Sequence, residues 1–166
     1  MNVLVAFYSE TGNTRRVAEA IFAGLEHAPK TLLPIDQVGE LGGYDLIFCG
    51  FPVINHGVPE KVVQFLKRIP AGKKVAFFAS HGSLRGGEKA VSAFYAAVSL
   101  TGRQKVLGTF GCRGQVKLQL IEALMEKFPH RAWAIEAQSA DGHPDAADLE
   151  DARAFAQQMF YKAEKA

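Results

Sequence analysis

Four short apolar runs recur along the chain, and each is followed by a longer stretch with helical spacing. The runs lie at residues 3–8, 45–50, 74–79 and 105–110, and residues 30–35 form a weaker fifth. Three of the four strong runs, VLVAFY, LIFCG and VAFFA, are apolar at almost every position. A strand with no polar alternation is normally covered on both faces, as in a parallel sheet. The runs therefore predict a parallel sheet buried between helices.

The stretches between these runs have the length and spacing of crossover helices. They span residues 14–27, 59–68, 87–101 and 146–162. In the first of them, Val17, Ile21 and Leu25 share one helix face. Regular alternation of strand and helix predicts an open α/β sheet with right-handed crossovers. An additional amphipathic segment at residues 116–128 follows the last strand, and we expect it to end before Pro129.

Composition narrows the classes of protein that fit this chain. Its 166 residues suit one domain over residues 1–166, since no repeat or linker divides them. With 48% hydrophobic and 22% charged residues, the chain has the balance of a folded protein. The 19 Lys and Arg residues are scattered and nearly balanced by 17 Asp and Glu residues, so nucleic acid is not an indicated partner.

The cysteine content and the hydropathy of the chain indicate the cellular compartment in which we expect the protein. The two cysteines, Cys49 in an apolar run and Cys112 beside glycines, are too few for a disulfide framework. The first residues lack the pattern of a signal peptide, and no apolar stretch approaches the roughly 20 residues that cross a bilayer. We therefore expect a soluble cytoplasmic protein without membrane insertion.

A polar loop after the first strand is the strongest functional signal. In sheets of this kind, ligands bind where the carboxyl ends of the strands open. Backbone N–H groups at a helix start, with a glycine that permits close approach, favour a phosphate there. A plain helix cap by Thr11 or Asn13 is the alternative, but capping needs one such residue and this loop offers four. The predicted phosphate site comprises Ser9, Glu10, Thr11, Gly12, Asn13 and Thr14.

The segment Ser-x-Thr-Gly-Asn-Thr in this loop resembles the FMN-phosphate loop of flavodoxins. The resemblance extends over most of the chain, with residues 116–128 as the unusual region. It implies a flavodoxin-like three-layer sheet of five parallel strands in the order 2-1-3-4-5, with helices on both faces. It also implies FMN as the cofactor and electron transfer between a reductase and an acceptor enzyme, by a monomer or weak dimer.

By the same resemblance, the loop after the third strand packs one face of the isoalloxazine ring. Flavodoxins commonly have Trp or Met where Ile54 falls, and Gly where this chain has Asn55. Asn tolerates positive φ better than other non-glycine residues, so a carbonyl flip towards flavin N5 is allowed but less free. The residues expected at the flavin from this loop are Pro52, Val53, Ile54, Asn55, His56 and Gly57.

The loop after the fourth strand departs further from flavodoxins. Flavodoxins usually stack a Tyr on the outer flavin face, whereas here Arg85 falls near that position. The guanidinium either stacks on the ring or faces a partner's carboxylate, or Arg85 is a solvated loop residue. Beside the flavin, its charge would raise the reduction potential. The residues expected at the flavin from this loop are Ser80, His81, Gly82 and Arg85.

The sequence gives weaker support for a metal site, a reactive thiol or a resident dinucleotide. His56 and His81 lack further residues at metal-ligand spacing, so we expect no metal site. Cys112 fits a small buried hydrophobe better than a reactive thiol. No G-x-G-x-x-G follows a strand, which argues against a resident dinucleotide. We assign no catalytic residue.

Two functions compete for this chain. An FMN-binding electron carrier is the leading hypothesis. The alternative is an FMN-dependent reductase that takes NAD(P)H or a quinone-type substrate over an uncovered flavin face. A third hypothesis, an accessory subunit without flavin, is disfavoured by the intact phosphate loop.

Overall fold

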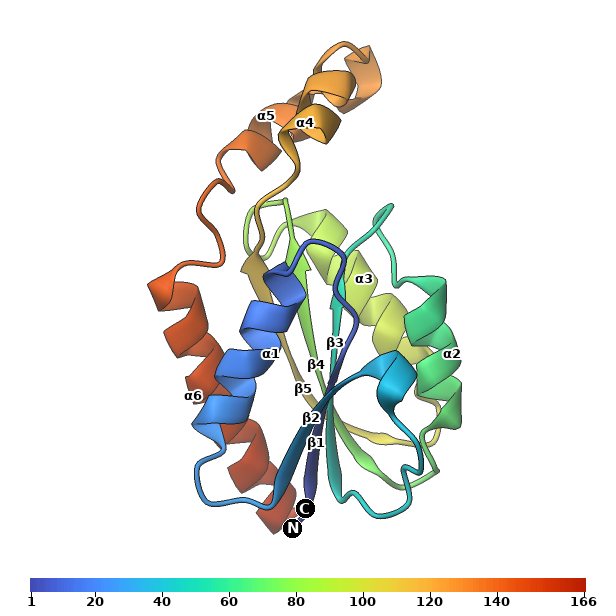
Figure 1. Ribbon diagram of the computed structural model, residues 1–166. Helices are drawn as coiled ribbons and strands as arrows, with labels where there is room; N and C mark the ends of the chain where they lie inside the picture. The colour runs from blue at the N-terminus through green and yellow to red at the C-terminus, as the bar shows by residue number, and fades with distance from the viewer.

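Five parallel strands form the centre of the molecule (Figure 1). The computed structural model describes residues 1–166, apart from the side chain of Lys89. The strand order is β2-β1-β3-β4-β5, which confirms the order implied by the flavodoxin resemblance. The strands are β1 (Val3–Phe7), β2 (Lys30–Pro34), β3 (Leu46–Pro52), β4 (Lys74–His81) and β5 (Lys105–Arg113).

Helices cover both faces of the sheet, as expected. On one face lie α1 (Asn13–Gly24) and α6 (Ala146–Lys165). On the other lie α2 (Glu60–Arg68) and α3 (Glu88–Ser99), with a 3₁₀ turn, η1 (Ile35–Gln37), at the β2 edge. Among the helices that the structure describes, none has the length and apolar character needed to span a bilayer.

Alternate residues of each strand enter two separate cores, which explains the continuous apolar runs. Val5, Phe48 and Phe78 pack with α1 and α6. Ile47 and Phe77 directly precede Phe48 and Phe78 in the sequence, and they pack with α2 and α3 on the opposite face. Because these side chains are fully buried on both sides of the sheet, no strand position here can be polar without losing packing energy.

Three strands extend further than the apolar runs indicate. β3 continues to Pro52. β4 continues through Ser80 and His81, and β5 continues to Arg113. Parallel pairing explains the extension, since Ser80 lies between Pro52 and Cys112, and His81 lies beside Arg113. Residues that the sequence assigns to ligand loops therefore sit on a rigid sheet edge.

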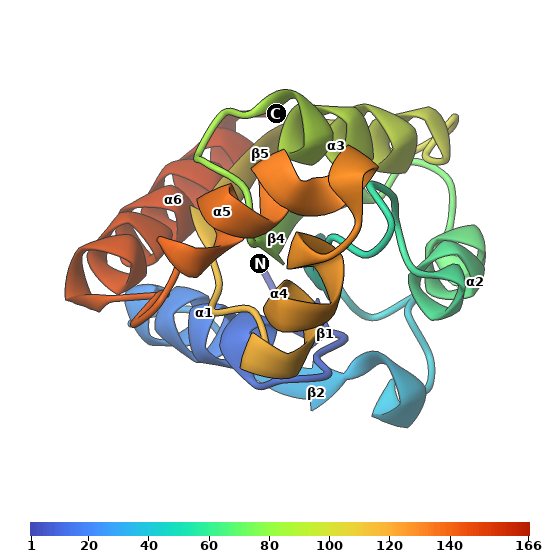
Figure 2. The same cartoon turned by 90° about the horizontal axis from the view of Figure 1, so that it is seen from above.

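After β5 the chain forms a helical arm, residues 116–140, beyond the carboxyl ends of the strands (Figure 1). It contains α4 (Leu118–Met125), a 3₁₀ turn η2 (Phe128–His130) and α5 (Arg131–Gln138). Seen from above, the arm lies across the carboxyl ends of the central strands (Figure 2). The sequence predicts the first helix but not α5, which begins directly after the turn that contains Pro129.

Candidate functional site

The loop between β1 and α1 has an open helix N-terminus. Gly12, at φ 92°, is the cap residue of α1, and it has no side chain with which to cap the helix. The alternative prediction, a plain helix cap by Thr11 or Asn13, is therefore wrong. Ser9 instead braces the loop from within, since its Oγ accepts hydrogen bonds from the backbone N–H groups of Gly12 (3.1 Å) and Arg15 (3.4 Å). The first N–H groups of a helix have no intrahelical acceptor, so this end is suited to an anion.

The other polar side chains of this loop differ in where they lie. Thr14 is buried, and its hydroxyl shares a 2.8 Å hydrogen bond with Ser80, which ties the loop to β4. Asn13 donates from Nδ2 to Thr11 Oγ1 (3.1 Å) and to the carbonyl of Gln115 (2.9 Å). The phosphate loop is thus connected to β4 and to the start of the helical arm.

The Glu10 carboxylate faces the phenol of the preceding strand end. Tyr8 donates its hydroxyl to Glu10 Oε1 at 2.7 Å. This hydrogen bond to the carboxylate raises the pKa of Tyr8 above its usual value. The phenol of Tyr8 therefore stays protonated at neutral pH.

The loop after β3 contains a tight two-residue turn. Ile54 and Gly57 exchange backbone hydrogen bonds (3.2 and 2.9 Å) around Asn55 and His56. Asn55 has φ 49°, as the sequence allows, and His56 has φ 64°, which the sequence does not indicate. Positive φ at both central positions is typical of a type I′ turn. The turn, residues 54–57, contains no phenyl, phenol or indole ring.

His81 ends β4 as a buried, neutral imidazole. Its side chain is buried, with Nδ1 2.9 Å from the carbonyl of Ser83. Burial lowers the pKa of His81 below its usual value, so the neutral form is favoured. In that form Nδ1–H donates to Ser83, and Nε2 has no hydrogen-bond partner among the described residues.

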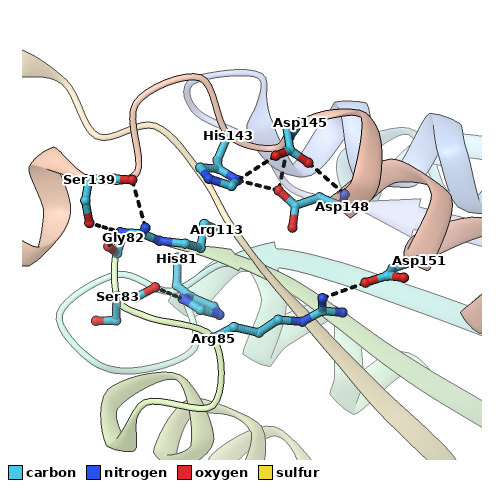
Figure 3. A network of polar contacts seen from close by, with 10 residues as sticks. All are labelled: His81, Gly82, Ser83, Arg85, Arg113, Ser139, His143, Asp145, Asp148 and Asp151. Atoms are coloured by element: carbon cyan, nitrogen blue, oxygen red, sulfur yellow. Dashed lines mark hydrogen bonds and ion pairs between the residues drawn. The ribbon is translucent and has the colours of Figure 1, made fainter.

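Arg85 points towards Asp151 at the start of α6 (Figure 3). Its Nη1 forms a 2.6 Å ion pair with Asp151 of α6, and its guanidinium lies over the ring of Phe110, 5.2 Å from the centroid. This placement corrects the expectation that Arg85 borders the outer flavin face. An exposed carboxylate and an aromatic face of β5 attract the guanidinium more than open solvent above the loop does.

The three predicted ligand loops and the helical arm enclose one cleft at the carboxyl edge of the sheet. The cleft consists of two adjoining hollows of about 380 and 290 Å³. Residues of the loops and residues of the arm line both of them. The residues common to the two hollows are Glu10, Val53, Ile54, His81, Gly82, Leu120 and Trp133. The larger hollow also contains Asn55, His56, Ser83, Ala90, Leu124 and His130. The smaller one continues to Thr11, Asn13, Pro52, Ser80, Gly114, Gln115, Val116 and Lys117.

The structure thus brings most of the predicted site residues to one cleft. Five of them do not line it: Ser9, Gly12, Thr14, Gly57 and Arg85. Ser9 and Gly12 instead line a hollow of about 570 Å³ on the β2 side of the phosphate loop. That hollow is larger, but it contains no residue of the loops after β3 or β4. The cleft under the arm is therefore the better candidate for a ligand that bridges all three loops.

Sequence reasoning missed the residues that the arm contributes to the cleft. Leu120, Leu124 and Trp133 supply its apolar side, and Lys117 supplies a cation at the phosphate end. The one available signal is the amphipathic segment after β5, in which Leu120 and Leu124 recur at i and i+4. Trp133 lies outside that segment, on the helix that was not predicted.

Arg113 fixes the arm to the sheet (Figure 3). It donates from Nη1 to the carbonyl of Ser139 (2.8 Å), and from Nη2 to the carbonyl of Glu136 and the hydroxyl of Ser139 (both 2.9 Å). A cation at the carboxyl end of α5 also complements the helix dipole. The Glu136 carboxylate accepts a 2.6 Å hydrogen bond from the backbone N–H of Leu84. The arm is therefore attached to β5 and to the loop after β4.

A group of ligand-type side chains at the start of α6 is explained by helix capping. One ligand-type atom from each of His143, Asp145 and Asp148 lies within 4.8 Å of the others (Figure 3). Asp145 and Asp148 form a reciprocal capping box, and His143 Nδ1 lies 2.5 Å from Asp148 Oδ2. These contacts give each carboxylate a structural role at the helix N-terminus.

Neither cysteine has the environment of a reactive thiol. Both are fully buried. Burial raises the pKa of Cys49 and raises that of Cys112 to about 12. Their thiols are therefore protonated at neutral pH and act as small core side chains.

Comparisons with known proteins agree with this geometry. The sequence matches the flavodoxin domain family over residues 4–157. The chain belongs to the flavodoxin domain family. A flavodoxin-like domain-containing protein, BilS, from Clostridioides difficile (strain CD3) is 26% identical over 179 residues, covering 98% of each chain. Family membership confirms FMN as the cofactor that the flavodoxin-like loop predicts.

Solved flavodoxin structures share the fold. The oxidised flavodoxin 2 from Bacillus cereus has a TM-score of 0.66 and 21% identity, covering 98% of this chain and 99% of its own. A flavoprotein from Lactobacillus acidophilus NCFM, solved in complex with FMN, has a TM-score of 0.55 and 16% identity, covering 66% of this chain and 92% of its own. At these identities, the likeness shows the fold alone.

The residues of the cleft fit a flavodoxin cofactor. The N-terminus of α1, whose cap residue is a glycine, matches a phosphate together with the nearby hydroxyl of Thr11 and the cation of Lys117. The larger hollow has apolar side chains from both the sheet edge and the arm, which match a planar ring. Polar donors at one end and apolar walls at the other correspond to the two ends of FMN.

Proposed function

We propose that this flavodoxin-domain protein is an FMN-binding electron carrier, which receives electrons from a reductase and delivers them to an acceptor enzyme. The observation that supports a carrier is the position of the helical arm over the cleft. Leu120, Leu124 and Trp133 line the cleft from the arm, and the arm itself lies over the carboxyl ends of the central strands (Figure 2). This covering leaves little room for a nicotinamide or quinone to stack on the flavin. A flavin beneath the arm is shielded from a second planar ligand, whereas an electron crosses such a covering more readily than a hydride.

The chain's own residues contribute binding and orientation. FMN supplies the one- and two-electron chemistry when it is bound. The backbone N–H groups at the start of α1 and the hydroxyl of Thr11 hold the phosphate. The turn at Asn55 and His56 and the β4 end at His81 border the ring. Because His81 is neutral, it adds no positive charge beside the ring.

The charge balance of the protein indicates the type of partner. The net charge is +2, with basic and acidic residues interspersed along the chain. Such a surface offers mixed rather than strongly acidic contacts, so a partner with mixed or acidic contacts fits it better than a strongly basic one. Electron transfer rates should then change modestly, or fall, as the salt concentration rises.

Anaerobic reduction separates a carrier from a reductase. The FMN-loaded protein is mixed with NADH or NADPH, and its visible absorption is followed before and after a catalytic amount of an NADPH-dependent flavodoxin reductase is added. A carrier keeps its oxidised spectrum until the reductase is present, and then bleaches. Rapid bleaching by NADH or NADPH alone, with turnover on a quinone, would contradict the proposed carrier function and support the reductase alternative.

A further inference from the structure

We propose that the helical arm forms the outer wall of the flavin site and that Trp133 is the aromatic ring that packs on the isoalloxazine. This inference rests on the proposed FMN site. The loops after β3 and β4 carry no large aromatic side chain into the cleft. Among the lining residues that the structure describes, Trp133 has the only phenyl, phenol or indole ring. An element outside the predicted flavin loops therefore supplies it.

The position of the indole is specific. Trp133 lines both the phosphate end and the ring end of the cleft. Its Nε1 donates a 3.0 Å hydrogen bond to Ser83 Oγ in the loop after β4. Gly82 gives it room, because a Cβ at this position would lie 3.2 Å from Trp133 Cζ2 and 2.5 Å from Val116 Cγ2. Because Gly82 has no side chain, the arm can pack directly against the edge of the sheet.

The arm holds the indole in a defined place. Ile121, Ala134 and Ala137 form a small buried core between α4 and α5, against which Trp133 packs. The hydrogen bonds from Arg113 and from the backbone of Leu84 attach α5 at two further points. A ring fixed by its own core and by the sheet loses little conformational entropy when a ligand binds, which favours affinity.

The chemistry of the two rings is complementary. An indole offers a flat apolar face, and stacking of an aromatic side chain on a heterocyclic base typically changes affinity by about five- to a hundredfold. Leu120 and Leu124 flank Trp133 on the same side of the cleft and exclude water from the ring. Leucines at these two positions extend the apolar wall without competing for the stacking face.

Three variants test the proposal by FMN titration. Trp133→Leu removes the ring, and Trp133→Phe keeps an aromatic ring but loses the hydrogen bond to Ser83. Phe128→Leu is the matched control, since Phe128 is 91% exposed on the arm and lines neither hollow. We expect FMN affinity to fall roughly ten- to a hundredfold in Trp133→Leu, less in Trp133→Phe, and not at all in the control.

Flavin fluorescence gives a second readout that is independent of affinity. An indole in contact with a flavin quenches its emission by electron transfer, so FMN bound to Trp133→Leu should be brighter than FMN bound to the wild type or to the control. Trp133 is the single tryptophan of the chain, so no other indole can quench. The emission lifetime of FMN in the wild-type protein needs no variant and should be far shorter than that of free FMN.

The outcomes distinguish this inference from the proposed function. If the wild type binds FMN but Trp133→Leu has the same affinity and equally quenched emission, the stacking role is wrong while the FMN site stands. A free-like emission lifetime in the wild-type complex overturns it too, even if Trp133→Leu fails to fold. If the wild type does not bind FMN, the proposed function itself fails.

Discussion

Replacement of Arg113 by Met should release the helical arm from the sheet while leaving the rest of the fold intact. The guanidinium makes three hydrogen bonds of 2.8–2.9 Å to Glu136 and Ser139 at the end of α5. A hydrogen bond from a charged group contributes about 1.5–3 kcal/mol. The three are coupled, and water replaces part of each because the partners lie near the surface. We therefore expect a net loss of about 2–3 kcal/mol in arm docking, or an open fraction about 30- to 150-fold larger.

Backbone amide hydrogen exchange, measured by mass spectrometry, reports how often the arm detaches from the sheet. Peptides from residues 116–140 should exchange faster in Arg113→Met, whereas peptides from β1 and β3 should keep their protection. Arg85→Met is the matched control, because that arginine also lies at the carboxyl edge but has a single ion pair, to Asp151, with both partners about half exposed. Its effect on the arm should be negligible.

One result would refute the reasoning on Arg113. If Arg113→Met and Arg85→Met leave equal exchange rates in the arm, then the guanidinium of Arg113 contributes nothing measurable. Other contacts, such as those of Val116 and Trp133 at Gly82, would then hold the arm to the sheet. Faster exchange over the whole chain would also count against it, because that outcome means loss of β5 rather than of the arm.

Three further predictions follow from the site. Thr11→Ala should weaken FMN binding roughly ten- to a hundredfold with an unchanged fold, by loss of a hydrogen bond to phosphate; equal affinity in a fluorescence titration would remove Thr11 from the site. Arg85→Ala should leave the flavin midpoint potentials within error of the wild type, since Asp151 holds the guanidinium outside the cleft; a clear downward shift in a redox titration would place Arg85 at the ring. His81 has a folded-state pKa below its unfolded value, so the unfolded chain binds the proton more readily. The free energy of unfolding should therefore fall as the pH drops below about 6.5, and urea titrations should show a weaker fall in His81→Leu.

Local sequence patterns determined the sheet, its flanking helices and the phosphate loop. The continuous apolar runs require burial on both faces, and Val17, Ile21 and Leu25 mark the buried side of α1. Gly12 and the hydroxyl-rich residues around it predict an anion site at a strand-to-helix turn. Each of these signals lies within a few adjacent residues, where backbone preference and burial act directly, so a single sequence is enough to detect them.

Contacts between distant residues were decided only by the tertiary structure. Asn13 meets Gln115 across 102 positions, Arg85 meets Asp151 across 66, and Trp133 meets Ser83 across 50. No local pattern encodes these pairs, because a side-chain contact depends on how whole elements are placed, and that placement is settled by the packing of the complete chain. The ion pair of Arg85 therefore became clear only from the placement of α6, and the contribution of Trp133 to the cleft only from the placement of the arm.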